Sequence, residues 1–177
     1  MNSFMNTWII DQAHSTIGFK VKHLMVSMVR GLFTEFEGSI QAADDTFAGA
    51  VATFTAQAKS INTNNEQRDG HLRSPDFFGS DEFPTITFTS TSFENKGDHF
   101  EVVGDLTMRG ITKSVTLEAT LNGTGPGMDG KKIVSFDVTG KINRQDFGVK
   151  WNAAIETGGM VVSDEVIFDI HVEAKES

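Results

Sequence analysis

Apolar and polar residues alternate with a period of two along most of this chain, and no other feature limits its fold as strongly. Runs of this kind occur at residues 8–11, 16–22, 35–40, 49–60, 85–89, 100–107, 115–121, 134–142 and 165–173. Alternation places apolar side chains on one face of a strand and polar side chains on the other. A sheet with one buried face and one wet face is typically antiparallel. The sequence therefore predicts an all-β protein with about eight or nine strands.

The expected strands are long for a chain of 177 residues. Long antiparallel strands seldom remain as an open sheet, because unpaired edges invite aggregation. Closure into an extended up-and-down β-barrel removes these edges, and about eight strands enclose room for one small ligand. No internal repeat or linker interrupts the pattern, so we expect a single domain over residues 1–177.

One connection breaks the series of strands. It contains Arg68, Asp69, His71 and the pair Phe77–Phe78, which together form the densest cluster of charge, imidazole and aromatic rings in the chain. Long connections in compact domains are usually functional or disordered, and paired phenylalanines argue against disorder. We predict a short helical segment here that covers one end of the barrel.

The strand expected at residues 49–60 carries small side chains on one parity, at Ala48, Ala50, Ala52, Ala56 and Ala58. Because interiors are close-packed, small inward residues must face either large side chains or a cavity. The chain has fifteen Phe and no Tyr, so an apolar tunnel for a linear hydrocarbon and a barrel filled by its own phenylalanines both remain open. Strand parity predicts the apolar lining as Phe19, Val21, Phe36, Ala50, Ala52, Phe54, Ala56, Ile86, Phe88, Val102, Leu106, Leu117, Phe136 and Phe168.

Signs of catalysis or metal binding are weak. The five histidines lack metal-ligand spacing, although a composite site from distant strands remains open, and neither a nucleophile elbow nor a phosphate-binding glycine loop is present. We therefore predict no catalytic residue, no metal and no cofactor. The candidates for contact with a polar ligand head are His23, Arg30, Asp69, His71 and Arg109. A core histidine, an ion-pair network and ordinary surface charges are the simpler interpretations of these residues.

The formal net charge of −9 disfavours nucleic acids and anionic membrane surfaces as main partners. There is no cysteine, and no apolar stretch approaches the roughly 20 residues that a membrane-spanning helix needs. The first residues lack a basic segment followed by an apolar run. We therefore expect a soluble, cytoplasmic protein without an integral membrane segment, or a periplasmic one if the native chain carries a signal not shown here.

Several blocks of the sequence resemble the YceI-like family, bacterial polyisoprenoid-binding proteins with a lipocalin-like barrel. The blocks are Trp8–Asp11, His14–Ser15, Phe19–Leu24, Arg30–Phe33, Ser60–Thr63, Arg68–Leu72, Asp76–Phe78, Phe83–Pro84, Gly104–Lys113 and Arg144–Gly148. They extend over nearly the whole chain.

The resemblance implies a barrel that holds an isoprenoid chain, such as an isoprenoid quinone or a polyprenyl derivative, with no established catalytic residues. It also makes a homodimer a candidate assembly. The residues and the resemblance together leave three functions open. The first is a carrier without turnover, the second is an enzyme that acts on the lipid head through His23, Asp69 or His71, and the third is a stress-linked interaction module with a filled barrel.

Overall fold

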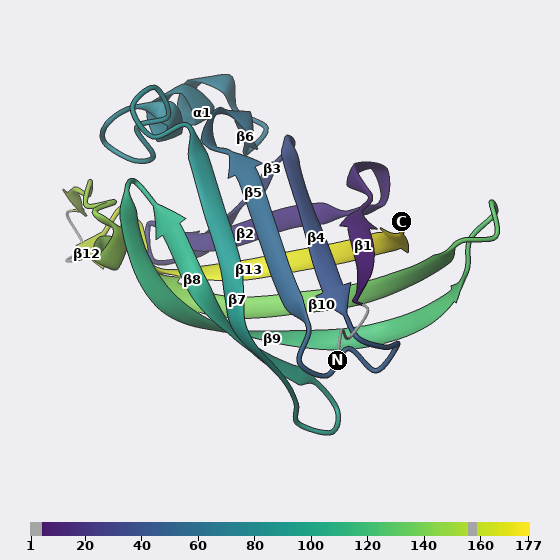
Figure 1. Ribbon diagram of the computed structural model, residues 1–177. Coiled ribbons are helices and arrows are strands. Elements are labelled where there is room, and N and C mark those ends of the chain that lie inside the picture. Colours follow the sequence, from purple (N-terminus) through teal and green to yellow (C-terminus); the bar gives the residue numbers. More distant parts are fainter. Residues whose placement is uncertain (1–4, 156–158) are drawn as a thin grey trace.

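The computed structural model describes residues 5–155 and 159–177, which form strands almost throughout (Figure 1). The only α-helix among these residues is α1, Glu66–Arg73. The strands are β1 Asn6–Ile10, β2 Thr16–His23, β3 Ser27–Phe33, β4 Phe36–Ala42, β5 Val51–Gln57, β6 Ile61–Asn62, β7 Thr85–Asn95, β8 Phe100–Met108, β9 Ile111–Pro126, β10 Lys132–Asn143, β11 Ala154–Ile155, β12 Gly159–Met160 and β13 Val162–Glu176. Single 3₁₀ turns follow β1, β5 and β10, at Gln12–His14, Ala58–Ser60 and Arg144–Phe147.

Eight of the strands close into an antiparallel barrel in the order β1-β4-β5-β7-β8-β9-β10-β13, with β13 returning to β1. The closing seam pairs Trp8 with Glu176 and Ile10 with Ala174. In Figure 1, β4, β5, β7 and β8 cross over β9, β10, β13 and β2, so the barrel is built from two crossing halves. The predicted all-β, lipocalin-like barrel with one short helix is therefore confirmed.

Strand β13 pairs with two different strands, β2 and β1, along the same edge. Its first part pairs with β2, where Phe168 faces Phe19, and its last residues pair with β1. The 3₁₀ turn at Gln12–His14 separates β1 from β2. Beyond β2, strands β3 and β6 extend the sheet past the closed ring.

Strand β3 is absent from the sequence prediction. Its alternation is interrupted because Met28 and Leu32 are apolar yet face outward, and because Gly31 faces inward without a side chain. A Cβ at Gly31 would lie 2.4 Å from the ring of Phe19, so glycine is what allows that ring to cross β3. The absence of a side chain at Gly31 interrupts the alternation by which β3 could be recognised. The same absence leaves the space that the Phe19 ring needs.

An aromatic cluster closes the barrel end that contains the β4–β5 connection. Phe47, in that connection, is fully buried, and its ring centroid lies 5.3 Å from those of both Trp8 and Phe136. Phe93 and Phe100 pack together beside Phe136, with centroids 5.0 Å apart. This end of the barrel is therefore sealed by five large rings.

Helix α1 lies over the opposite end (Figure 1). Its N-cap, Asn65, accepts a hydrogen bond from the backbone N–H of Arg68, which satisfies one of the free donors of the first turn. Buried Asp69 accepts hydrogen bonds from both the backbone N–H and the hydroxyl of Thr63, at 2.9 and 2.5 Å. These bonds fasten the helix to β6, so the long connection forms a lid with a fixed position.

Candidate functional site: an apolar cavity

The barrel encloses a cavity of about 710 Å³. Inward side chains of β2, β5, β7, β8, β9, β10 and β13 form its wall, and α1 with the loop that follows covers one end. This volume falls within the range typical of small-molecule sites. The interaction-module hypothesis required a barrel filled by its own side chains. The cavity shows that the barrel is not filled in this way.

Most of the lining predicted from strand parity does face this cavity. The residues concerned are Phe19, Val21, Ala52, Phe54, Ala56, Ile86, Phe88, Val102, Leu106, Leu117, Phe136 and Phe168. Long strands make parity a good guide, because a single inward residue fixes the direction of every second neighbour. Their contact with a ligand remains a prediction.

Phe36 and Ala50 do not line the cavity, and both predictions need correction. Phe36 points inward, but it is buried in a side cluster with Ile17 and stacks on Phe54 with centroids 6.1 Å apart. Phe54 therefore presents its own surface to the cavity instead. Ala50 lies before the start of β5, and its N–H donates to the carbonyl of Phe47. Strand parity does not apply to a residue that lies outside the strand.

Strand parity missed a second group of lining residues, at the lid. Trp151, Phe77, Phe78 and Leu72 all face the cavity. The rings of His71 and Trp151 meet edge-on with centroids 4.9 Å apart, and Phe77 lies 5.4 Å from Trp151. These residues lie on a helix and on loops, so period-two reasoning had no means of placing them.

Most polar residues of the lining gather near the lid. They include Lys22 and His23 at the end of β2 and Asn65, Gln67, Arg68 and His71 around α1, whereas Ser39 and Thr53 lie on β4 and β5. Of these, His23 and His71 were predicted as head contacts, whereas Arg68 was not. Arg68 is held in place by hydrogen bonds from its Nε to the Thr63 hydroxyl, at 2.7 Å, and from its Nη2 to the Thr63 carbonyl, at 2.8 Å. This end of the cavity therefore offers positive charge and hydrogen-bonding groups.

Arg30, Asp69 and Arg109 do not line the cavity, which corrects three further predictions. Arg30 lies on the outer face, where its guanidinium is 3.7 Å from the Asp169 carboxylate. Asp69 is 4% exposed and is occupied by its two bonds from Thr63. Asp69 therefore cannot join His23 and His71 as the enzyme hypothesis supposed.

Arg109 stabilises the structure of the lid. It lies in the turn between β8 and β9 with φ at 52°, and its Nη1 donates to the carbonyls of Pro75 and Phe77, each at 2.6 Å. Its guanidinium also lies 5.7 Å from the Phe83 ring centroid. Arg109 thus ties the lid to the barrel instead of reaching into the cavity.

Arg144 is a buried cation in the cavity wall that was not predicted as a site residue. It is 3% exposed and donates to the carbonyls of Ser163, Val149 and Val162, at 2.9, 2.7 and 3.4 Å. Burial lowers the pKa of Arg144, and the carboxylate of Asp164, 3.7 Å away, opposes this shift. The three carbonyl bonds hold the segments on both sides of β11 and β12 against the barrel.

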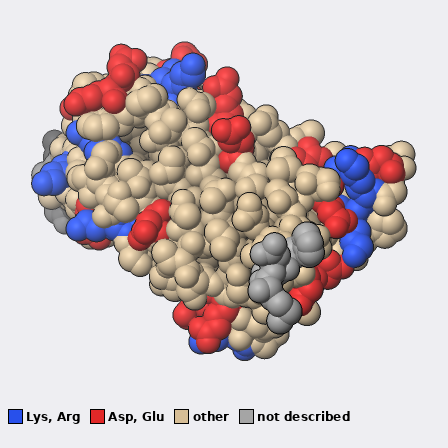
Figure 2. Space-filling view, in the orientation of Figure 1, with Lys and Arg blue, Asp and Glu red and all other residues tan. Residues whose placement is uncertain are grey.

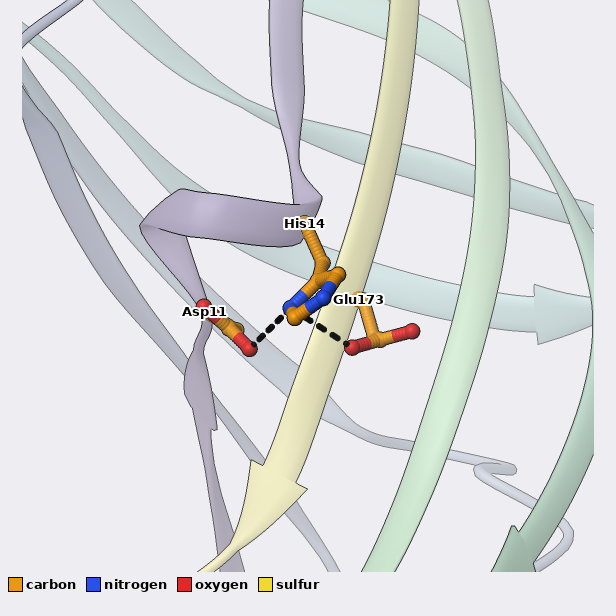
Figure 3. A group of neighbouring side chains, drawn as sticks. All are labelled: Asp11, His14 and Glu173. Atoms are coloured by element: carbon orange, nitrogen blue, oxygen red, sulfur yellow. Dashed lines mark hydrogen bonds and ion pairs between the residues drawn. The ribbon is translucent and has the colours of Figure 1, made fainter. Parts of the chain in front are cut away.

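One cluster outside the cavity brings a histidine and two carboxylates together. Asp11, His14 and Glu173 have ligand atoms within 4.8 Å of one another (Figure 3). His14 Nδ1 lies 2.7 Å from Asp11 and 3.4 Å from Glu173. The hydrogen bond to Asp11 raises the pKa of His14, with a smaller electrostatic contribution from Glu173, and the same bond lowers the pKa of Asp11. Ion pairing accounts for this geometry, and the cluster fastens the 3₁₀ turn to β13.

Fold and cavity together define the class of this protein as a lipocalin-like β-barrel with an apolar internal cavity. A model of the YceI-like domain matches residues 8–174. The chain therefore belongs to the YceI-like domain family. No helix in the described part of the chain is both long and apolar enough to cross a membrane.

Relatives in sequence and structure agree with this assignment. A UPF0312 protein of Staphylococcus aureus (strain N315) is 44% identical over 171 residues, covering 96% of this chain and 97% of the relative. The crystal structure of the Campylobacter jejuni YCEI protein matches with a TM-score of 0.77 and 35% identity, over 94% of this chain and 96% of that one.

A polyisoprenoid binding domain from Saccharophagus degradans, implicated in plant cell wall breakdown, also has this fold. It matches with a TM-score of 0.68 and 19% identity, over 96% of this chain and 98% of that one.

Proposed function

We propose that this protein binds a long-chain isoprenoid lipid, such as an isoprenoid quinone or a polyprenyl derivative, and carries it without chemical turnover. The observation that carries the proposal is the barrel cavity of about 710 Å³, whose wall is mostly apolar. An apolar chain gains about 0.8 kcal/mol for each CH₂ group that leaves water, so this wall favours a hydrocarbon ligand. The predicted lining residues that face the cavity would contact that chain.

The cavity is long enough for several isoprene units. Its lining on β13 runs from Val162 to Val172, which corresponds to roughly 30 Å of strand. An extended isoprene unit advances about 5 Å, because its four backbone bonds are each near 1.5 Å. We therefore propose a buried chain of about six units, beyond which further length adds no contact with the wall.

The polar head of the ligand would lie beside α1. Lys22 and Arg68 supply positive charge there, and His23, Asn65 and His71 supply hydrogen-bonding groups. The other end is sealed by the aromatic cluster around Phe47, so a head group could not leave through it. A head with oxygen acceptors or negative charge suits this arrangement.

A carrier role agrees better than an enzymatic one with the polar groups near the lid. Arg68 is bonded to Thr63, and His71 Nε2 lies 3.0 Å from the Asp76 carboxylate. Asp69 belongs to the helix anchor. The fold shared with a polyisoprenoid binding domain lends support to the choice of ligand class.

The test is mass spectrometry of an organic extract of the natively purified protein, followed by titration of delipidated protein with an isoprenoid quinone in detergent. We expect about one isoprenoid per chain, recovered unchanged after incubation with the protein. Protein that is reproducibly empty and takes up no quinone would refute the binding proposal. A ligand recovered with a cleaved or modified head would instead establish an enzyme.

A further inference from the structure

The hairpin that joins β2 to β3 ends in exposed apolar side chains. Leu24 is 42% exposed, Met25 52%, Val26 87% and Met28 43%. We call residues 24–28 the hairpin tip. Met160 of β12, half exposed, lies nearby, because the neighbouring Val161 accepts a hydrogen bond from the N–H of Leu24 at 2.9 Å. Apolar side chains gathered in this way commonly mark a contact surface.

The backbone of the hairpin tip is strained, because two residues with bulky side chains have left-handed φ angles. Leu24 and Met25 have φ of 52° and 65°, and the N–H of Val26 closes the turn on the carbonyl of His23 at 3.2 Å. Two successive left-handed residues in a hairpin are normally Asn and Gly, which tolerate positive φ. Leucine and methionine make this turn less stable, so their presence is better explained by what they contact than by folding.

The hairpin tip lies beside the lid end of the cavity. His23, immediately before it, and Val29, immediately after it, both line the cavity, as do Val161 and Val162 alongside. Strand β3 pairs with β6 only at Leu32 and Phe33, so within the described chain its edge near the tip has no neighbouring strand. A ligand passing between β3 and α1 would pass next to the tip.

The hairpin also differs in charge from the rest of the chain. The protein has a formal net charge of −9, yet no Asp or Glu occurs between Asp11 and Glu35, where Lys20, Lys22 and Arg30 are found. Arg30 is paired with Asp169 of β13 at 3.7 Å, so the positive charge of the hairpin comes mainly from Lys20 and Lys22. Figure 2 shows Lys and Arg side chains at the end of the molecule where Figure 1 places β12. The negative charge of the whole chain therefore does not keep this local surface from an anionic membrane, since screening limits charge effects to about 8–10 Å.

We propose that the hairpin tip inserts into the surface of an anionic lipid bilayer, so that the isoprenoid passes between membrane and cavity at the lid. The inference rests on the proposed function, because the cargo of such a carrier dissolves in bilayers and hardly at all in water. Apolar side chains flanked by cations suit a bilayer with anionic heads. A second copy of the chain suits the tip less well, because a two-fold contact would bring the same cations face to face.

The test compares the wild-type protein with the double variant L24N/M25G in flotation with vesicles of phosphatidylethanolamine and phosphatidylglycerol. The variant places the preferred residues at both left-handed positions, so its Tm should be unchanged or higher by about 2–4 °C. It also removes two apolar side chains, so its affinity for vesicles should fall at least about tenfold. Loss of binding together with retained or higher Tm excludes unfolding as the cause.

Quinone uptake from detergent separates docking from ligand binding. We expect both proteins to bind detergent-dispersed quinone equally, whereas the variant should load more slowly from quinone-containing vesicles. If neither protein binds quinone from detergent, the proposed function fails while flotation still decides whether the tip docks. Equal flotation of both proteins, or no flotation of the wild type, overturns the docking proposal. So does a wild-type dimer that the substitutions dissociate, because a second copy would then cover the tip.

Discussion

Replacement of Ala52 by Phe should shorten the longest isoprenoid that the barrel can hold. Ala52 is partly buried and faces the cavity from β5, and its backbone N–H is fixed by a hydrogen bond of 2.8 Å to the Ser90 hydroxyl. The added ring would therefore project into the lumen. It would occupy about the space of one five-carbon isoprene unit.

The magnitude follows from the hydrocarbon that the ring displaces. Five carbons contribute up to roughly 4 kcal/mol when fully buried, which corresponds to about a thousandfold in Kd. Rearrangement of the chain would recover part of this loss, so we expect a Kd between about tenfold and a thousandfold weaker for a chain that fills the wild-type cavity. A chain shorter by two units should bind both proteins with similar affinity.

The assay is a titration of delipidated protein with isoprenoids of increasing length. Wild-type affinity should rise with each added unit and then level off, and Ala52→Phe should level off one or two units earlier. Val51→Phe is the matched control, because Val51 is the neighbouring residue on the opposite, outer face of β5. If Ala52→Phe levels off at the wild-type length, or if Val51→Phe shows the same shift, then Ala52 does not limit the length of the bound chain. Circular dichroism should verify folding, since overpacking can cost about 1–3 kcal/mol.

Three other predictions concern stability. Arg144→Met should lower the free energy of unfolding by about 2–4 kcal/mol in denaturant titrations, because the guanidinium serves three carbonyls in the wall; an unchanged midpoint would contradict this. His14→Asn should lower Tm most near about pH 5–6 and least near about pH 9. The raised pKa of His14 stabilises the fold at pH values below the unfolded-state pKa of about 6.5, and this contribution is lost as pH rises through the folded-state pKa. A Tm difference that grows toward pH 9 would contradict this prediction. Gly104→Ala should cost about 1–3 kcal/mol, since a Cβ there would lie 2.4 Å from the Phe88 ring, whereas Gly123→Ala, with open space around it, should be nearly neutral in the same titration.

Strand periodicity was enough to predict the barrel and most of its inner wall. Phe54 and Ala56 could be placed because strands fix side-chain direction two residues at a time. The same rule fails at the margins of strands. The predicted strand at residues 49–60 was too long, because β5 begins at Val51 and a 3₁₀ turn follows Gln57, and the misplacement of Ala50 came from this.

The lid could be located from the sequence but could not be oriented. Successive helix residues differ by about 100° in direction, so neighbouring Arg68 and Asp69 have different surroundings. One lines the cavity and the other anchors the helix to Thr63. The sequence does not show which of these two residues faces the cavity and which anchors the helix. Only the packing of α1 against β6 decides this. Trp151 could not be placed for a similar reason, since a loop has no regular period that would predict the direction of its side chains.

The seam between β1 and β13 has a consequence for how the protein folds. Trp8 pairs with Glu176, so the first strand of the ring meets its last partner only after residues 174–176 have left the ribosome. Until then β4–β10 can form as successive hairpins, but their apolar inner faces remain open to water. Contacts between residues so far apart in sequence slow folding and prolong the exposure of intermediates that aggregate. A lipid or a chaperone that covers the open sheet during synthesis would therefore raise the yield of folded protein more than it raises the stability of the finished barrel.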